Sequence, residues 1–168
     1  MYLNEIYRHA RDYPDTIAVV HNGNPVTYRQ FAVFIDAVRA HLEQSQLTQG
    51  GLVATLTSNL YFDWVLLLDL RSLGYDTVSA TDWDVVESLD LRDLRAVICF
   101  AVQEHSLRDV IEKRPDLPVV TIPLPLHSKL KPGESPELIH GGRFGDHILF
   151  SSGTTGDFKK LRYNGEVT

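Results

Sequence analysis

The sequence predicts an α/β fold: a mainly parallel sheet with helices on both faces. Short β-type runs alternate with helical segments through the first 122 residues, and parallel strands need helical crossovers of this kind. One run, Ala96 to Ala101, is apolar throughout. The length of 168 residues suits one domain.

The N-terminal elements are a helix and a strand. Residues 3–12 place apolar side chains on one helical face, and this helix should end before Pro14, because a residue preceding proline avoids helical angles. Ile17 to Val20 is a short β-type run. Asn22 to Pro25 has the composition of a turn, from which Val26 leads into the next helix.

The second helix has the clearest start in the sequence. Thr27 and Gln30, three residues apart, form a capping box. Apolar residues then recur at helical spacing from Phe31 to Leu42, and Gly50-Gly51 interrupts the chain before the next strand.

A strand at Leu52 to Leu56 is followed by a helix over residues 60–73, for which Ser58 or Asn59 can act as the cap. This helix is apolar nearly all round, so we expect it to be buried on most sides. Gly74 is a natural stop.

The alternation continues to residue 122. The expected elements are a strand at Asp76 to Ser79, a helix at Trp83 to Leu89, the strand Ala96 to Ala101, a helix capped by Ser106 with Asp109 and running to about Arg114, and a strand at Val119 to Ile122.

Residues 123–145 hold four of the eight prolines and four glycines, which indicates a long surface connection. His147 to Phe150 is a last short strand. The single domain over residues 1–168 thus divides into an α/β unit (1–122), the connection (123–145), and a strand, loop and start of a hairpin (146–168).

Composition excludes several classes of protein. The net charge of -6 does not suit a general nucleic-acid binder. The longest apolar stretch, near Tyr61 to Leu73, is too short and too charged to span a bilayer. The start has no apolar signal core, and the single cysteine excludes an internal disulfide. We therefore expect a cytoplasmic protein.

The loop after the last strand carries the chemistry. It reads SSGTTGDFKK over residues 151–160. Its glycines let the backbone approach a ligand, its N–H groups can converge on an anion, and Lys159 can add a positive charge. These groups suit a polyphosphate, although the spacing is not that of a P-loop. On composition alone, the alternative is a solvated surface loop.

The order SSGTTGxxK after an apolar strand resembles the phosphate loop of the adenylate-forming superfamily: acyl-CoA synthetases, peptide-synthetase adenylation domains and luciferases. Three more segments resemble that family in the same order: Val26 to Phe31 ("LTYxEL"), Gly51 to Asn59 ("GDxVALLLPN") and Leu66 to Ser79 ("LGALKAGAxxVPL"). The resemblance covers roughly residues 15–163. It departs at Phe158 and Lys160, where the family has proline and glycine.

The resemblance implies the N-terminal fragment of an ATP-dependent carboxylic acid ligase. Such enzymes form an acyl-adenylate and pyrophosphate, and most then pass the acyl group to CoA or to the phosphopantetheine arm of a carrier protein. Lys159 would be catalytic by offsetting charge on pyrophosphate, and Mg²⁺ is expected with ATP. The phosphate-binding residues implied are Ser151, Ser152, Gly153, Thr154, Thr155, Gly156 and Lys159.

The family places its acyl pocket, nucleoside contacts, magnesium ligand and a late lysine after this loop. Asn164-Gly165 predicts a hairpin turn that pairs Lys160 to Tyr163 with a strand starting at Glu166, of which three residues remain. We therefore expect this chain alone to be inactive, to need the remainder of the enzyme, and to expose apolar surface that could also support a homo-oligomer.

Two other functions remain open. One is a shortened, non-catalytic relative that serves as a nucleotide-binding or dimerisation module, which Phe158 and Lys160 favour. The other is an unrelated α/β nucleotide binder, which lacks support because no G-x-G-x-x-G follows the first strand.

Other candidate residues have ordinary structural explanations. The seven histidines show no metal-ligand spacing, so no metal ligand is assigned, although His140 and His147 could line a site. Cys99 is expected to be a buried small hydrophobe. Two further expectations are that Tyr61 and Trp64 belong to the core, and that Asp82, Asp84 and Glu87 form an acidic helix start rather than a cation site.

Overall fold

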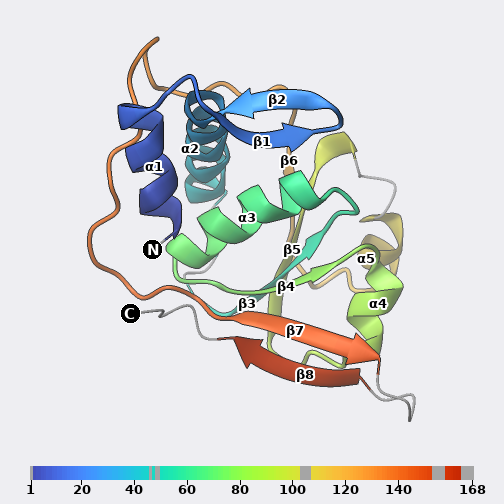
Figure 1. The fold of residues 1–168 in the computed structure, drawn as a ribbon. Helices are drawn as coiled ribbons and strands as arrows, with labels where there is room; N and C mark the ends of the chain where they lie inside the picture. The colour runs from blue at the N-terminus through green and yellow to red at the C-terminus, as the bar shows by residue number, and fades with distance from the viewer. Residues whose placement is uncertain (1, 46, 48–49, 103–106, 153–157, 164–168) are drawn as a thin grey trace.

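The computed structural model describes residues 2–45, 47, 50–102, 107–152 and 158–163. Its main sheet has six strands in the order β6-β5-β3-β4-β7-β8 (Figure 1). All neighbouring pairs are parallel except β7 and β8, which confirms the predicted sheet. The strands are β3 (Leu52–Leu56), β4 (Asp76–Ala80), β5 (Leu94–Phe100), β6 (Val119–Ile122), β7 (His147–Ser152) and β8 (Phe158–Tyr163).

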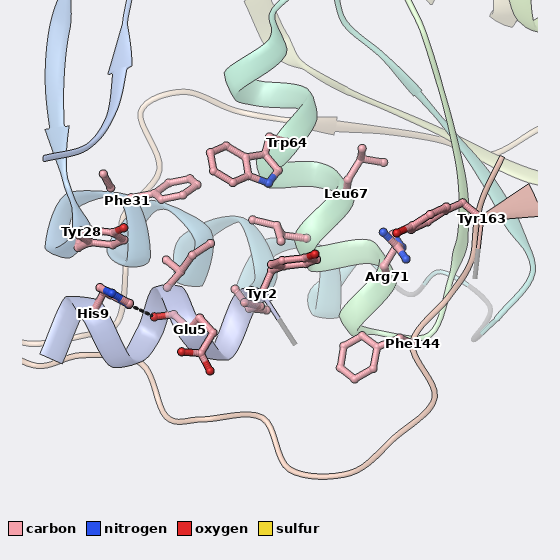
Figure 2. A pocket seen from close by; sticks show the side chains of 14 residues that line it. Tyr2, Glu5, His9, Tyr28, Phe31, Trp64, Leu67, Arg71, Phe144 and Tyr163 are labelled. Carbon is pink, nitrogen blue, oxygen red and sulfur yellow. Dashed lines mark hydrogen bonds between the residues drawn. The ribbon is translucent and has the colours of Figure 1, made fainter. Parts of the chain in front are cut away.

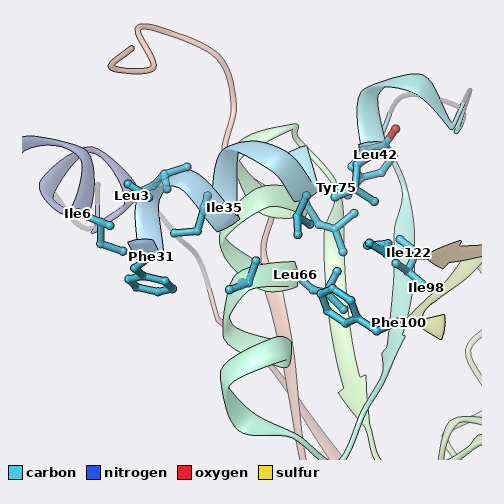
Figure 3. Packing of buried hydrophobic residues seen from close by; sticks show 14 of the residues in the cluster. Leu3, Ile6, Phe31, Ile35, Leu42, Leu66, Tyr75, Ile98, Phe100 and Ile122 are labelled. Atoms are coloured by element: carbon cyan, nitrogen blue, oxygen red, sulfur yellow. The ribbon is translucent and has the colours of Figure 1, made fainter. Parts of the chain in front are cut away.

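Helices cover both faces of this sheet, as the alternation predicted. They are α1 (Tyr2–Asp12), α2 (Tyr28–Gln44), α3 (Leu60–Ser72), α4 (Trp83–Ser88) and α5 (Arg108–Lys113). The first three pack with Val53, Ile98 and Phe100 into one core cluster (Figure 3). The last two pack with alternate residues of the same strands into a second cluster, because successive side chains point to opposite faces.

The helix ends follow local sequence signals. The side chain of Thr27 accepts from the backbone N–H of Gln30, and the Gln30 side chain accepts from that of Thr27, so the predicted capping box is present. Asn59, rather than Ser58, caps α3. Gly74 follows α3 with φ of 88°, a conformation that favours glycine. α5 begins at Arg108, and Ser106 lies outside the described residues.

One strand was not predicted. Asn24–Thr27 forms β2, which pairs antiparallel with β1 (Ile17–His21) in a small separate sheet. Asn22 and Gly23, both with positive φ, form the two-residue turn. Treating all four residues Asn22 to Pro25 as a turn was therefore wrong. Pro25 is tolerated because β2 is bonded on one side only.

The connection between β6 and β7 contains no helix or strand and runs past α2 and α1 (Figure 1). Asn4 of α1 makes two hydrogen bonds to this connection. Its side chain accepts from the N–H of Ile139 at 2.9 Å and donates to the carbonyl of Ile139 at 2.8 Å. Ser128 donates to Asp36 of α2 at 2.8 Å. These contacts hold the connection on the helices and lead the chain back to the sheet.

α3 is less deeply buried than its composition predicted. Val65, Leu66 and Leu70 are fully buried, but Leu60 is 86% exposed and Trp64 is 42% exposed. The placement of Trp64 in the core was therefore wrong, because the helix presents that side to an open pocket. Tyr61 does pack against the core, stacking on Phe34. No helix in the described part of the chain is both long and apolar enough to cross a bilayer.

Candidate functional site

The segment predicted to bind phosphate lies at the β7–β8 hairpin. The two strands pair through Ser151↔Lys159 and Ser152↔Phe158, so five residues connect them. Four predicted site residues fall in this connection and lie outside the described residues: Gly153, Thr154, Thr155 and Gly156. The hairpin itself was not predicted, since Lys160 to Tyr163 were expected to pair with a strand starting at Glu166, a segment also outside the described residues.

Sheet topology places the carboxyl end of β7 at the edge where parallel α/β sheets commonly bind ligands. β7 runs parallel to β4, and β4 runs parallel to β3. The carboxyl end of β7 therefore lies at the same edge of the sheet as Thr57–Asn59, which follow β3, and Thr81, which follows β4. Ligands of open α/β sheets bind outside the carboxyl ends of the strands.

Ser151 and Lys159 face one another across the hairpin and are exposed. Directly opposed residues on one sheet face have Cβ atoms about 5 Å apart. No ion pair formed within the described residues uses Lys159. A hydroxyl and an ammonium with no counter-ion in the described part of the chain thus flank the start and end of the connection, where they can contact an anion together.

Lys160 points to the other face of the same strand. It pairs with Phe150, which packs against the second core cluster beside α4 and α5. Because side chains alternate along a strand, Lys159 and Lys160 serve opposite faces of the sheet. The structure therefore places Lys159, the lysine assigned to the phosphate site, and Lys160 on opposite faces of the sheet.

An ion-pair network anchors the other end of the hairpin. Arg162 of β8 donates to Asp146 at 2.6 Å and also contacts Asp76 of β4. Asp76 accepts from the N–H of Asp146 at 2.8 Å, and the guanidinium of Arg143 lies 3.7 Å from Asp76. Sequence analysis missed these residues because only the register of β4, β7 and β8 brings them together.

The chain enters β7 through a close contact that requires glycine. A Cβ on Gly145 would lie 1.6 Å from the carbonyl oxygen of Tyr75. Gly145 donates to the carbonyl of Arg71 at 2.9 Å, and Arg71 Nε donates back to the carbonyl of Gly145 at 2.8 Å. This reciprocal pair holds the residue before Asp146 and β7 against the end of α3 and thereby positions the hairpin.

His147 lies at the opposite end of β7 from the connection. Its Nδ1 is 2.9 Å from the hydroxyl of Thr77, and burial lowers its pKa. On the same sheet face, the Thr55 hydroxyl lies 2.7 Å from Asp63 and 3.0 Å from Ser79. These contacts give His147 a structural role in the packing of β7 against β4. His140 lies on the surface connection between β6 and β7 and is exposed.

The other candidates have structural roles. Asp82 caps α4 by accepting from Val85, while Asp84 and Glu87 pair with Lys113 at 3.3 and 2.9 Å. Cys99 is fully buried, as predicted. Within the described residues, no group of three or more histidine, cysteine, aspartate or glutamate side chains could hold a metal ion.

No protein-family model matches the chain, and no curated protein matches it. Several solved structures do match the chain. The inhibitor-bound N-terminal domain of FACL13 from Mycobacterium tuberculosis has a TM-score of 0.68 at 23% identity and covers 98% of this chain and 44% of that chain. A fatty acyl CoA synthetase from Mycobacterium tuberculosis has a TM-score of 0.65 at 20% identity. This match covers 96% of this chain and 34% of the synthetase chain.

The N-terminal subdomain of NpsA from Klebsiella oxytoca, in complex with 3-hydroxybenzoyl-AMSN, has a TM-score of 0.62 at 19% identity and covers 95% of this chain and 40% of that chain. At these identities the likeness concerns the fold. The chain has the fold of the N-terminal part of adenylate-forming enzymes, as the motifs predicted, and spans less than half the length of each of these three structures.

Proposed function

We propose that this chain is the N-terminal part of an ATP-dependent carboxylic acid ligase, which activates an acid as acyl-AMP with release of pyrophosphate. The observation that carries the proposal is the exposed Lys159 opposite Ser151, at the two ends of the SSGTTGDFK segment, with no ion pair to any described residue. Both lie at the carboxyl end of β7, the edge where such sheets bind ligands. The shared fold supports it, as does the binding of 3-hydroxybenzoyl-AMSN by one similar structure.

In this proposal the residues from Ser151 to Gly156 cradle the β- and γ-phosphates of ATP. Lys159 contacts the same phosphates, and its charge offsets the negative charge that grows on the leaving pyrophosphate. Groups held in place before the reaction stabilise such charge without reorganising. The strand pairing of β7 and β8, anchored by Arg162 and Asp146, supplies that fixed geometry.

Mg²⁺ would accompany the nucleotide and shield its phosphate charge. We propose that it is held by the phosphates and by the remainder of the enzyme, because the described residues offer no cluster of metal ligands. The acyl pocket, and the thiol acceptor, CoA or a phosphopantetheine arm, would likewise depend on that remainder. We place the enzyme in the cytoplasm.

The phosphate site can be tested with two adjacent lysines. Lys159→Ala should weaken binding of Mg-tripolyphosphate to the chain about tenfold, the usual effect of one charge-assisted contact. Lys160→Ala is the matched control, because it removes the same charge from the opposite face of the same strand. Isothermal titration calorimetry measures both. Equal losses in the two variants would mean that net charge alone attracts the phosphate.

The non-catalytic dimerisation module is the second candidate, and one observation favours it. Leu149 and Leu161 oppose one another on the face of β7 and β8 that carries Lys159, and they are 50% and 66% exposed. An exposed apolar cross-strand pair beside an open strand edge attracts a partner. If the chain is a dimerisation module, it should sediment as a dimer in analytical ultracentrifugation, and Leu161→Lys should dissociate that dimer. A wild-type chain that stays monomeric at all concentrations would rule out this second candidate.

A further inference from the structure

A second site lies away from the hairpin connection. A pocket of about 630 Å³ opens between α1, α3 and Tyr163 (Figure 2). Its volume falls within the range of roughly 300–1,000 Å³ typical of small-molecule sites. Figure 2 shows His9 and Tyr28 at one end, Arg71 and Tyr163 at the other, and Trp64 along the wall. A lining of aromatic and aliphatic side chains suits a flat apolar ligand.

One cation at the end of this pocket has no counter-charge among the residues that the structure describes. Arg71 is half-buried, and none of the ion pairs within the described residues uses it. Its Nε is committed to the carbonyl of Gly145, which fixes the guanidinium plane while the terminal nitrogens have no hydrogen bond to any described residue. Glu5, the one carboxylate among the described residues that line the pocket, is paired with Arg8.

We propose that this pocket binds a small aryl carboxylate, with the acid group on Arg71 and the ring body against Trp64. A fixed guanidinium recognises a carboxylate in a planar, bidentate manner. An apolar wall with one convergent charged group is the usual composition of a site for such a molecule. An uncharged ligand of the same shape would leave the guanidinium unpaired and bind less tightly.

This site is distinct from the phosphate site. Arg71 holds Gly145, just before β7, whereas the SSGTTG segment leaves the carboxyl end of that strand. Six residues of extended strand separate the two ends by roughly 20 Å. The inference therefore does not rest on the proposed function, and a phosphate-site variant should leave aryl carboxylate binding unchanged.

The test uses biphenyl-4-carboxylate and, as its uncharged partner, biphenyl-4-methanol, titrated into the whole chain by calorimetry. The wild type should bind the acid more tightly than the alcohol. Arg71→Gln should weaken acid binding about tenfold and leave alcohol binding unchanged, while Arg71→Lys should restore part of the loss. Arg108→Gln, an exposed arginine on the other face of the sheet, is the matched control and should change neither.

A second variant keeps the test decisive if Arg71→Gln fails to fold. Trp64→Leu changes a wall residue that is 42% exposed, so the fold should tolerate it, and it should weaken acid and alcohol alike. The inference is overturned if the wild type does not bind the acid, if Arg71→Gln or Trp64→Leu folds normally and binds the acid as the wild type does, or if Lys159→Ala abolishes acid binding.

Discussion

Replacing Asp69 by leucine should stabilise the protein. Asp69 lies on α3, is fully buried, and neither oxygen of its carboxyl group has a hydrogen-bond partner among the described residues. Burial raises its pKa well above the usual range; Arg39 opposes this shift, while Asp36 and Glu43 add to it. A buried acid without partners is costly, because water no longer solvates it.

The magnitude and the sign follow from linkage. The unfolded carboxyl loses its proton near pH 4, while the buried one keeps it to a higher pH, and each unit of difference lowers stability by about 1.4 kcal/mol. Stability due to Asp69 is therefore lost as pH rises from about 4 to the folded-state pKa. Replacing a buried ion pair by apolar residues of similar volume is often neutral or stabilises by about 1–4 kcal/mol. Asp69 has no hydrogen-bond partner to lose among the described residues, so we expect a gain within this range for Asp69→Leu near neutral pH.

Urea denaturation at about pH 5 and about pH 8 measures the effect. Asp69→Leu should unfold at higher urea at both values, with a larger gain at the higher one. Asp69→Asn should gain less, since the amide still lacks partners. If the leucine variant is less stable than the wild type at about pH 8, the carboxyl group has a stabilising partner and the reasoning is wrong.

Four other substitutions test the fold. Gly145→Ala should destabilise by about 1–3 kcal/mol, because its Cβ would overlap the carbonyl of Tyr75; Gly141→Ala, with open space at its Cβ but φ of 76°, should cost about 1 kcal/mol, and thermal melts compare the two. Thr27→Ala should cost about 1 kcal/mol by removing the cap of α2, measured by urea denaturation. Arg162→Gln should speed amide hydrogen exchange in β8 more than in β5, because only β8 loses an anchor; equal protection would contradict this.

Local signals allowed most of the fold to be predicted from the sequence. The capping box at Thr27 and Gln30, the stop at Gly74 and the apolar run at Ala96 each act over a few residues, and each was confirmed. β2 was missed because its pairing with β1 is tertiary information that Pro25 obscured. The burial of Asp69 was hidden because it depends on how α1 and α2 pack over α3.

For the candidate site, the sequence predicts which residues take part but not their geometry. The motif named Ser151 and Lys159, yet their opposition across a hairpin follows from strand register, which no local pattern reports. The pocket at Arg71 gave no sequence signal at all, because its walls come from α1, α3 and the end of β8.

The most direct test of the central claim is to titrate the ¹⁵N-labelled chain with Mg-tripolyphosphate and follow the backbone amide resonances. The account predicts a saturable response with the largest shifts between Ser151 and Lys159, lost in Lys159→Ala and kept in Lys160→Ala. No saturable response, or shifts centred on another part of the chain, would contradict the assignment of this segment as a phosphate site.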